Sequence, residues 1–241
     1  MNKHTKTKTS SGKEEGEITS VVNRRLFLRS AGLATSLGTI VIAAACNDDD
    51  DDPMIPGTGD TVDLGSGDIG VLNYAYALEQ LEAAFYTQVV QTPYAGMTDT
   101  EKAILTDIRD HEIVHREFFK AALGDKAIKG LTPNFAAIDF TKKDAVLGAA
   151  KLFEDTGVAA YNGAGKLIKD PNYLLLAGKI VSVEARHAAV IRDLISPKTA
   201  SFAGDDIIDA NGFDKAVAPA DILAAVKGYV KDTITGANVG K

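Results

Sequence analysis

Cysteine is nearly absent from this chain. Its 241 residues contain one cysteine, Cys46, which therefore cannot form a disulfide within the chain. Histidine is also scarce, with four residues in all. An apolar content of 45% and a charged content of 24% nevertheless suffice for one well-packed core, and the length permits one or two domains. The order of the segments along the chain favours a single folded domain behind an N-terminal leader.

A hydrophobic run long enough to span a membrane is missing from the leader. Its apolar stretch, residues 31–45, is too short and too rich in Gly, Ser and Thr for a spanning helix. Before it stand Arg24 and Arg25, followed by the letters LFLR. This pattern resembles a twin-arginine export signal, which carries folded proteins across a bacterial membrane, although Asn23 and Arg29 depart from the usual residues. A basic leader for the unfolded-chain route is the alternative.

Cys46 ends the apolar stretch and follows three alanines. This arrangement resembles a lipoprotein cleavage site, at which the signal peptide, residues 1–45, is removed and the cysteine is acylated. Residues 46–67 would then be a solvated tether, because they combine the acidic tract NDDDDD with Pro and Gly. We therefore expect an extracytoplasmic, membrane-anchored lipoprotein, in the bacterial periplasm or on the cell surface. A free or buried thiol is the alternative for Cys46.

An excess of basic residues is also missing. Residues 1–45 hold seven basic and three acidic residues, so the remainder has 19 basic against 30 acidic residues and a net charge of −11. Binding to nucleic acid depends on basic surface that contacts phosphate. The charge of the mature chain therefore argues against nucleic acid as a partner.

Strand patterns are absent after residue 67, and helical periodicity takes their place. Four helices are expected, and their start and stop signals place them at about Ile69 to Pro93, Thr98 to Gly124, Thr141 to Lys169 and Asp170 to Pro197. The second and third begin at capping boxes, in which Thr98 pairs with Glu101 and Thr141 with Asp144. The fourth has Asp170 as its N-cap and Pro171 as its first residue.

The connections between these helices set the expected fold. Very short loops join the first helix to the second and the third to the fourth, which forces two antiparallel hairpins. Between the hairpins lie the 17 residues 124–140, and an extended chain covers roughly 3.3 to 3.6 Å per residue, enough to run the length of a bundle. Residues 68–241 are thus predicted to form an all-α four-helix bundle with one long crossover between helices two and three, plus a short helix after Pro219.

Two Glu-x-x-His pairs lie in these helices. Glu112 and His115 belong to the second helix, and Glu184 and His187 belong to the fourth. Residues three apart lie on the same helix face, one turn from each other. One such pair is weak evidence for a metal site, but the chain repeats it in the other half of the bundle.

The first and third helices extend the repeat. Glu79 and Glu154 are each followed after seven residues by a tyrosine, Tyr86 and Tyr161. The first glutamate lies about 18 Å and its Glu-x-x-His partner about 21 Å from the turn that joins their helices, at about 1.5 Å per residue. The second hairpin gives similar depths. All four carboxylates are therefore expected in one layer at the middle of the bundle, around a pseudo-twofold axis.

Four carboxylates against a bundle core would repel one another and would be costly to desolvate unless cations neutralised them. Two divalent ions fulfil this role, because bridging carboxylates hold them roughly 3.5 to 4 Å apart and each imidazole completes one ion's shell while leaving an open position. Oxygen and imidazole ligands suit iron and manganese alike. The expected metal ligands are Glu79, Glu112, His115, Glu154, Glu184 and His187.

This constellation resembles the ferritin-like superfamily, in particular the exported ferritin-like domain family that includes desiccation-related proteins. The resemblance covers roughly residues 68–230, includes all six ligand positions, and extends to the late segment NGFDKAVAPADILAAVKGYV. It implies a di-iron centre that oxidises Fe(II) or reduces oxygen or hydrogen peroxide in stress defence. A manganese, catalase-like enzyme and a non-catalytic desiccation scaffold with structural metal are the alternatives. The oligomeric state, a homo-oligomer included, stays open.

Several neighbouring residues have a second interpretation. Glu82 competes with Glu79 as the ligand from the first helix; we favour Glu79 and expect Glu82 to be a surface group or a neighbour of the ligands. Tyr86 and Tyr161 either pack as core aromatics or hydrogen-bond a ligand carboxylate and quench radicals. His111 lies about 100° around the helix from Glu112, so we expect it to face solvent.

Overall fold

The computed structural model describes residues 60–241. The paired arginines Arg24 and Arg25, the expected lipidation site Cys46 and most of the expected tether lie outside the described residues. Within residues 60–241, no helix is both long enough and apolar enough to cross a membrane.

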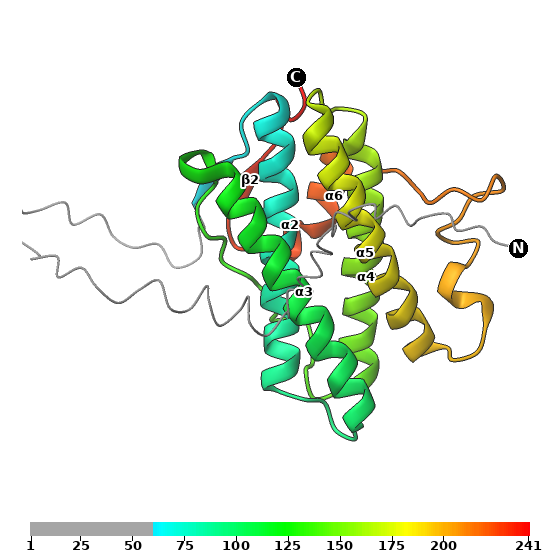
Figure 1. The fold of residues 1–241 in the computed structure, drawn as a ribbon. Helices are drawn as coiled ribbons and strands as arrows, with labels where there is room; N and C mark the ends of the chain where they lie inside the picture. Colours follow the sequence, from blue (N-terminus) through cyan, green and yellow to red (C-terminus); the bar gives the residue numbers. More distant parts are fainter. Residues whose placement is uncertain (1–59) are drawn as a thin grey trace, which may run out of the picture. The chain divides into compact units, whose positions relative to one another are not determined.

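Five α-helices form the described part of the chain. They are α2 (Gly67–Gln91), α3 (Asp99–Leu123), α4 (Lys143–Gly165), α5 (Pro171–Ile195) and the short α6 (Pro219–Val226). Figure 1 shows the α2/α3 hairpin beside the α4/α5 hairpin, with α6 packed near α4. The predicted four-helix bundle with a short C-terminal helix is confirmed.

Most helix ends lie where the sequence signals place them. The Thr98 hydroxyl accepts from the Glu101 amide at 3.2 Å, and the Glu101 carboxylate accepts from the Thr98 amide at 2.8 Å, which completes the predicted capping box of α3. Asp170 caps α5 by accepting from the amide of Asn172 at 2.8 Å.

The predicted capping box of α4 is wrong. Lys142 is the N-cap residue, without a side-chain cap, and α4 begins at Lys143 and ends at Gly165 instead of near Lys169. The hydroxyl of Thr141 instead donates to Asp139 at 2.6 Å. The Thr141 hydroxyl, which was expected to cap α4, is thus used in a local hydrogen bond to a neighbouring side chain.

Two three-residue strands depart from the expectation of an entirely helical domain. β1 (Thr61–Asp63) pairs in parallel with β2 (Thr233–Thr235), and Val62 and Leu64 are buried. The end of the segment assigned to the tether is therefore part of the folded domain. Three residues are too few to show a periodicity, and their partner strand lies far away along the chain, so sequence pattern alone does not reveal the pair.

The crossover, residues 124–142, runs alongside α2 over the whole length of the helix. Near the start of α2, Asn73 bonds the backbone of Lys126 and Ile128 at 2.9 and 3.0 Å. Two turns after Asn73, Gln80 accepts from the amide of Leu131 at 2.8 Å. At the far end, the backbone amide of Ala95 donates to the carbonyl of Thr141 at 3.1 Å.

Because the crossover covers its outer side, α2 is buried almost all round. Asn73 and Gln80 are buried polar residues whose side chains are satisfied by the crossover backbone. Phe85 extends the contact, since its ring packs edge-on against Phe135 and Phe153 with centroids 5.8 and 5.0 Å apart. The crossover thus returns the chain to the end of the bundle where α4 must begin.

Gly163 is the point where the segment leading to α6 crosses α4 most closely. A Cβ added to Gly163 would lie 1.8 Å from the carbonyl oxygen of Val217. The amide of Val217 also donates to the carbonyl of Ala159 at 3.0 Å, so backbone rather than a movable side chain would have to shift. Gly148, on the same helix, has no atom within 4 Å of an added Cβ.

We expect Gly163→Ala to lower the free energy of unfolding by about 1–3 kcal/mol, the usual cost of overpacking. Gly148→Ala is the matched control and is expected to raise it by about 0.5–1 kcal/mol, because alanine replaces glycine inside a helix without a clash. Urea unfolding followed by circular dichroism measures both. Equal effects of the two substitutions would contradict the close crossing.

Candidate metal centre

Four glutamates, one from each long helix, lie in one layer in the middle of the bundle. They are fully buried, each with 0% exposure, and are Glu79 on α2, Glu112 on α3, Glu154 on α4 and Glu184 on α5. The depth estimated from loop to carboxylate in the sequence therefore agrees with the structure.

The two histidines of the Glu-x-x-His pairs complete two groups of four residues. One quartet is Glu79, Glu112, His115 and Glu184; the other is Glu112, Glu154, Glu184 and His187. Within each quartet, one potential ligand atom per residue lies within 4.8 Å of the others. Glu112 and Glu184 belong to both quartets, so their carboxylates lie between two adjacent positions for a cation.

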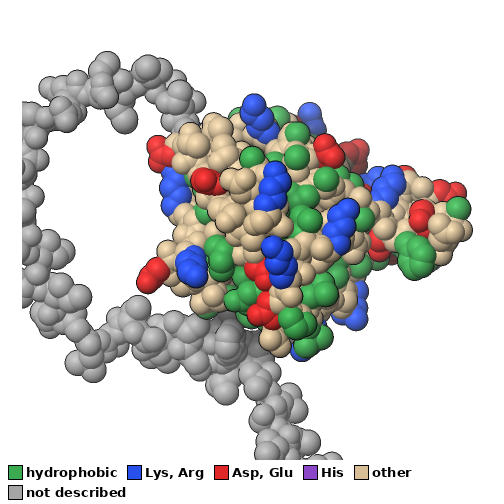
Figure 2. Space-filling view, turned by 90° about the horizontal axis from the view of Figure 1, so that it is seen from above, with side chains coloured by type: hydrophobic (Ala, Val, Ile, Leu, Met, Phe, Trp, Pro, Cys, Tyr) green, Lys and Arg blue, Asp and Glu red, His purple; other side chains and the backbone are tan. Residues whose placement is uncertain are grey.

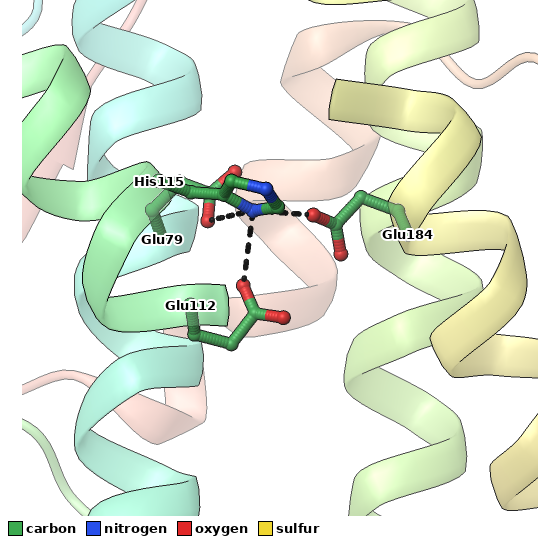
Figure 3. Close-up of side chains that lie close together, drawn as sticks. All are labelled: Glu79, Glu112, His115 and Glu184. Atoms are coloured by element: carbon green, nitrogen blue, oxygen red, sulfur yellow. Dashed lines mark ion pairs between the residues drawn. The ribbon is translucent and has the colours of Figure 1, made fainter. Parts of the chain in front are cut away.

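The Glu-x-x-His pairs of α3 and α5 meet reciprocally. His115 Nδ1 lies 2.8 Å from Glu184 Oε1, and His187 Nδ1 lies 2.7 Å from Glu112 Oε1. Figure 3 shows carboxylates from α2, α3 and α5 directed at the ring of His115. Each histidine therefore contacts the glutamate of the other motif more closely than that of its own, which lies 3.7 or 3.5 Å away.

The hydrogen bonds that these six side chains lack indicate whether a metal ion would fit among them. Within residues 60–241, ten buried side-chain polar atoms have no hydrogen-bond partner, and eight of them belong to the six residues. The eight are six carboxylate oxygens and both Nδ1 atoms. Buried polar groups in folded proteins almost always have hydrogen-bond partners. Divalent cations bound at this centre would provide the missing partners for these eight atoms. The donor set fits bound metal.

The two tyrosines satisfy the remaining carboxylate oxygens. Tyr86 on α2 donates to Glu154 Oε1 at 2.5 Å, and Tyr161 on α4 donates to Glu79 Oε1. Each tyrosine thus bonds the glutamate of the opposite helix, not the one seven residues before it. Burial and the charge of the bonded glutamate raise the pKa of both phenols, so both stay protonated and act as donors.

Burial makes the charged form of Glu112 and Glu154 unfavourable when no cation is present. It raises the pKa of Glu154 to about 7. Burial and the neighbouring charge of Glu184 also raise the pKa of Glu112 well above its usual value. A bound cation reverses this electrostatic cost, because it stabilises the same carboxylates in their ionised form.

His111 does not simply face solvent, as the helical position predicted. It is half-buried, its Nδ1 lies 2.9 Å from His187 Nε2, and the two rings stack with centroids 5.2 Å apart. A hydrogen bond to the outer nitrogen of a histidine fixes its ring orientation and leaves the inner nitrogen free for a metal. The position of α5 against α3 covers His111, and the α3 sequence alone does not contain this information.

Glu82 is also buried rather than at the surface, with 3% exposure. It belongs to neither quartet, whereas Glu79 belongs to one of them. Its carboxylate lies against Gly157, where an added Cβ would be 3.0 Å from Glu82 Oε1. Burial and the charges of the four other glutamates raise its pKa well above the usual value.

Three other charged residues of α3 and α4 have ordinary ion pairs. Asp110 pairs with Arg109 at 2.7 Å, and Arg116 pairs with Glu117 at 2.7 Å. Asp155 pairs with the buried Arg192 at 2.6 Å, on the side of α4 away from the carboxylate layer.

Comparison with known families agrees with this geometry. The family model of the ferritin-like domain matches residues 67–197, which is more than half of the chain. The chain belongs to the ferritin-like domain family. The matched residues include all four long helices and every member of both quartets. A comparison with curated proteins gave no match.

In this ferritin-like chain the centre is closed on most sides. The four glutamate side chains have no exposure, whereas the side chains of His115 and His187 retain 12% and 5%. The histidines come from α3 and α5, so the most accessible edge of the centre lies between these two helices. A buried Glu/His cluster of this composition can bind metal.

The shared and unshared glutamates should differ in their effect on metal binding. We expect Glu112→Ala or Glu184→Ala to abolish binding of both ions, because each residue belongs to both quartets. Glu79→Ala or Glu154→Ala removes a residue of one quartet and should leave one ion bound. Equilibrium dialysis with Mn(II) or Fe(II), followed by elemental analysis, measures the stoichiometry. The same loss from all four variants would contradict the shared-carboxylate geometry.

Proposed function

We propose that this protein is an exported, lipid-anchored di-iron protein that oxidises Fe(II) or reduces oxygen or hydrogen peroxide in stress defence. The observation that carries the proposal is the convergence of eight unsatisfied ligand atoms on a centre with two shared carboxylates. Carboxylate and imidazole are the ligands that iron and manganese prefer. Membership of the ferritin-like family supports the same choice.

Iron bound at the two quartets would supply electrons for the reduction of oxygen or peroxide. The chain's own residues perform the remaining tasks. The four glutamates neutralise the cations, and the tyrosines hold Glu79 and Glu154 by hydrogen bonds. His111 fixes the ring of His187. Buried apolar neighbours such as Phe85 and Phe153 exclude water from the layer.

The tyrosines have a second proposed role. Tyr86 and Tyr161 lie within hydrogen-bond distance of carboxylates on opposite sides of the centre. A phenol so placed can give up an electron to a strong oxidant while its proton moves along the existing hydrogen bond to the carboxylate. This would protect the surrounding core from oxidation.

The proposed location rests on the leader. Arg24 and Arg25 fit export of a folded chain, and Cys46 after three alanines fits acylation and anchoring at a membrane, in the periplasm or on the cell surface. The anchor argues against an iron-storage shell, because lipidated chains around a closed sphere could not all reach one membrane through tethers of about 20 residues.

An anaerobic titration with Fe(II), followed by peroxide or air, tests the proposal. We expect saturation at two irons per chain and rapid oxidation, seen as near-ultraviolet absorption of Fe(III). In Glu112→Ala the oxidation should slow to the rate of free Fe(II) in the same buffer. Glu117→Ala removes an exposed carboxylate from the same helix and should behave as the unmodified chain.

The other outcomes of this titration point to different functions. Tight binding of Mn(II) with evolution of oxygen from peroxide would replace the di-iron assignment with a catalase-like enzyme. Metal binding that raises the melting temperature without any turnover of oxidant would instead identify a scaffold with structural metal.

A further inference from the structure

A cavity of about 620 Å³ lies on the outer side of α4 and α5. Its floor is made by these two helices, and its walls by α6 and by the segment 196–218, which we call the excursion. Figure 1 shows the excursion in orange leaving the end of α5, and Figure 2 shows it protruding from the bundle. Pockets for small organic molecules occupy about 300–1,000 Å³, so the size fits such a ligand.

The cavity floor lies back to back with the metal centre. On α5, Glu184 and His187 face the centre, whereas Ala185 and Ala188 line the cavity. Ala159 and other small residues of α4 continue the floor. The distance between a molecule on this floor and the carboxylate layer is therefore about one helix diameter, ~10 Å.

Arg192 holds the excursion against the floor and has no capacity left for a ligand. It is 1% exposed and donates to both oxygens of Asp155 at 2.8 and 2.6 Å and to Asp206 of the excursion at 3.0 and 2.8 Å. Lys151 also pairs with Asp206, at 3.4 Å, and the amine of Lys215 donates to the carbonyl of the same aspartate. Each of the three cations of the lining thus has a partner on Asp206.

The charge of the lining selects against anions. The three cations are outnumbered by four aspartates, namely Asp155, Asp206, Asp214 and Asp221. Asp214 is half-buried in the cavity wall, where its carboxylate can accept a hydrogen bond from a ligand. At the mouth, the apolar side chains of Phe202 and Leu152 are 55% and 41% exposed. The site therefore offers aromatic and aliphatic surface plus an acceptor, and its excess of aspartates disfavours a phosphate or carboxylate.

We infer that this cavity binds a small neutral aromatic molecule with hydroxyl donors, of the hydroquinone or catechol class, and that this molecule is the reductant of the metal centre. Phe202 would cover its ring, the alanine floor would support the other face, and Asp214 would accept from a hydroxyl group. The role as reductant rests on the proposed function, whereas binding does not.

The redox step balances with the oxidant already proposed. A hydroquinone loses two electrons and two protons and becomes a quinone. Hydrogen peroxide takes up two electrons and two protons and becomes two molecules of water. The electrons would cross α4 and α5 to the centre, Asp214 would pass the two protons to solvent, and the peroxide would take up two protons from solvent. One hydroquinone would be consumed for each peroxide.

Binding is tested on the metal-free full-length chain with 1-naphthol as a fluorescent probe, since the chain has no tryptophan to interfere. We expect saturable binding that Phe202→Ala weakens by about three- to tenfold, as for the loss of an aromatic contact. Phe213→Ala is the matched control, because Phe213 lies on the same excursion, is 69% exposed and does not line the cavity. It should leave binding unchanged.

A second pair of variants tests the floor. Ala185→Leu places a larger side chain inside the cavity and should weaken 1-naphthol binding, whereas Ser182→Leu adds the same side chain to an exposed position one turn earlier on α5. Absence of saturable binding, or equal effects of lining and control variants, overturns the proposed site.

The reductant role is tested with iron-loaded protein, hydroquinone and hydrogen peroxide. We expect hydroquinone to sustain peroxide consumption, and Phe202→Ala to lower this rate while a single round of Fe(II) oxidation without hydroquinone proceeds normally. If Fe(II) oxidation is normal and Phe202→Ala does not change the rate of peroxide consumption with hydroquinone, the reductant role is refuted. The proposed function is then unaffected. Intact 1-naphthol binding without any Fe(II) oxidation refutes the proposed function and the reductant role together, and leaves the binding site standing.

Discussion

The burial of four carboxylates in one layer of the bundle is the constraint on which the rest of the structure depends. A fully buried, unpaired carboxylate is costly, and here Glu79, Glu112, Glu154 and Glu184 face one another. Two tyrosines reduce this cost by donating to Glu154 and Glu79, yet eight ligand atoms, both histidine Nδ1 atoms among them, keep no hydrogen-bond partner. The surrounding core therefore holds a charge arrangement that bound cations would complete.

The long crossover makes that arrangement reciprocal. By returning along α2, residues 124–142 make α4 run antiparallel to α2, so the second hairpin repeats the first around a pseudo-twofold axis. Tyr86 then meets Glu154 while Tyr161 meets Glu79, and each histidine meets the glutamate of the other motif. The symmetry is broken where Gly157 stands opposite Glu82, which gives the centre a fifth buried carboxylate on one side only.

Much of the fold and of the centre could be predicted because its signals are local. Capping residues, loop lengths and the Glu-x-x-His spacing identified the four helices, the crossover and the six clustered side chains. What failed depends on contacts between segments far apart in the chain. The half-burial of His111 follows from the way α5 packs on α3, β1 needs its partner β2, and Thr141 bonds Asp139 instead of capping α4. The cavity behind α5 likewise exists only because the excursion folds back onto Arg192.

The central claim is that the shared carboxylates Glu112 and Glu184 lie between two metal ions. Diffraction data collected at the iron absorption edge from crystals of the Fe(II)-loaded chain test this most directly. The account predicts two anomalous peaks, one within each quartet, with Glu112 and Glu184 in contact with both. A single peak, or peaks away from the carboxylate layer, would contradict it.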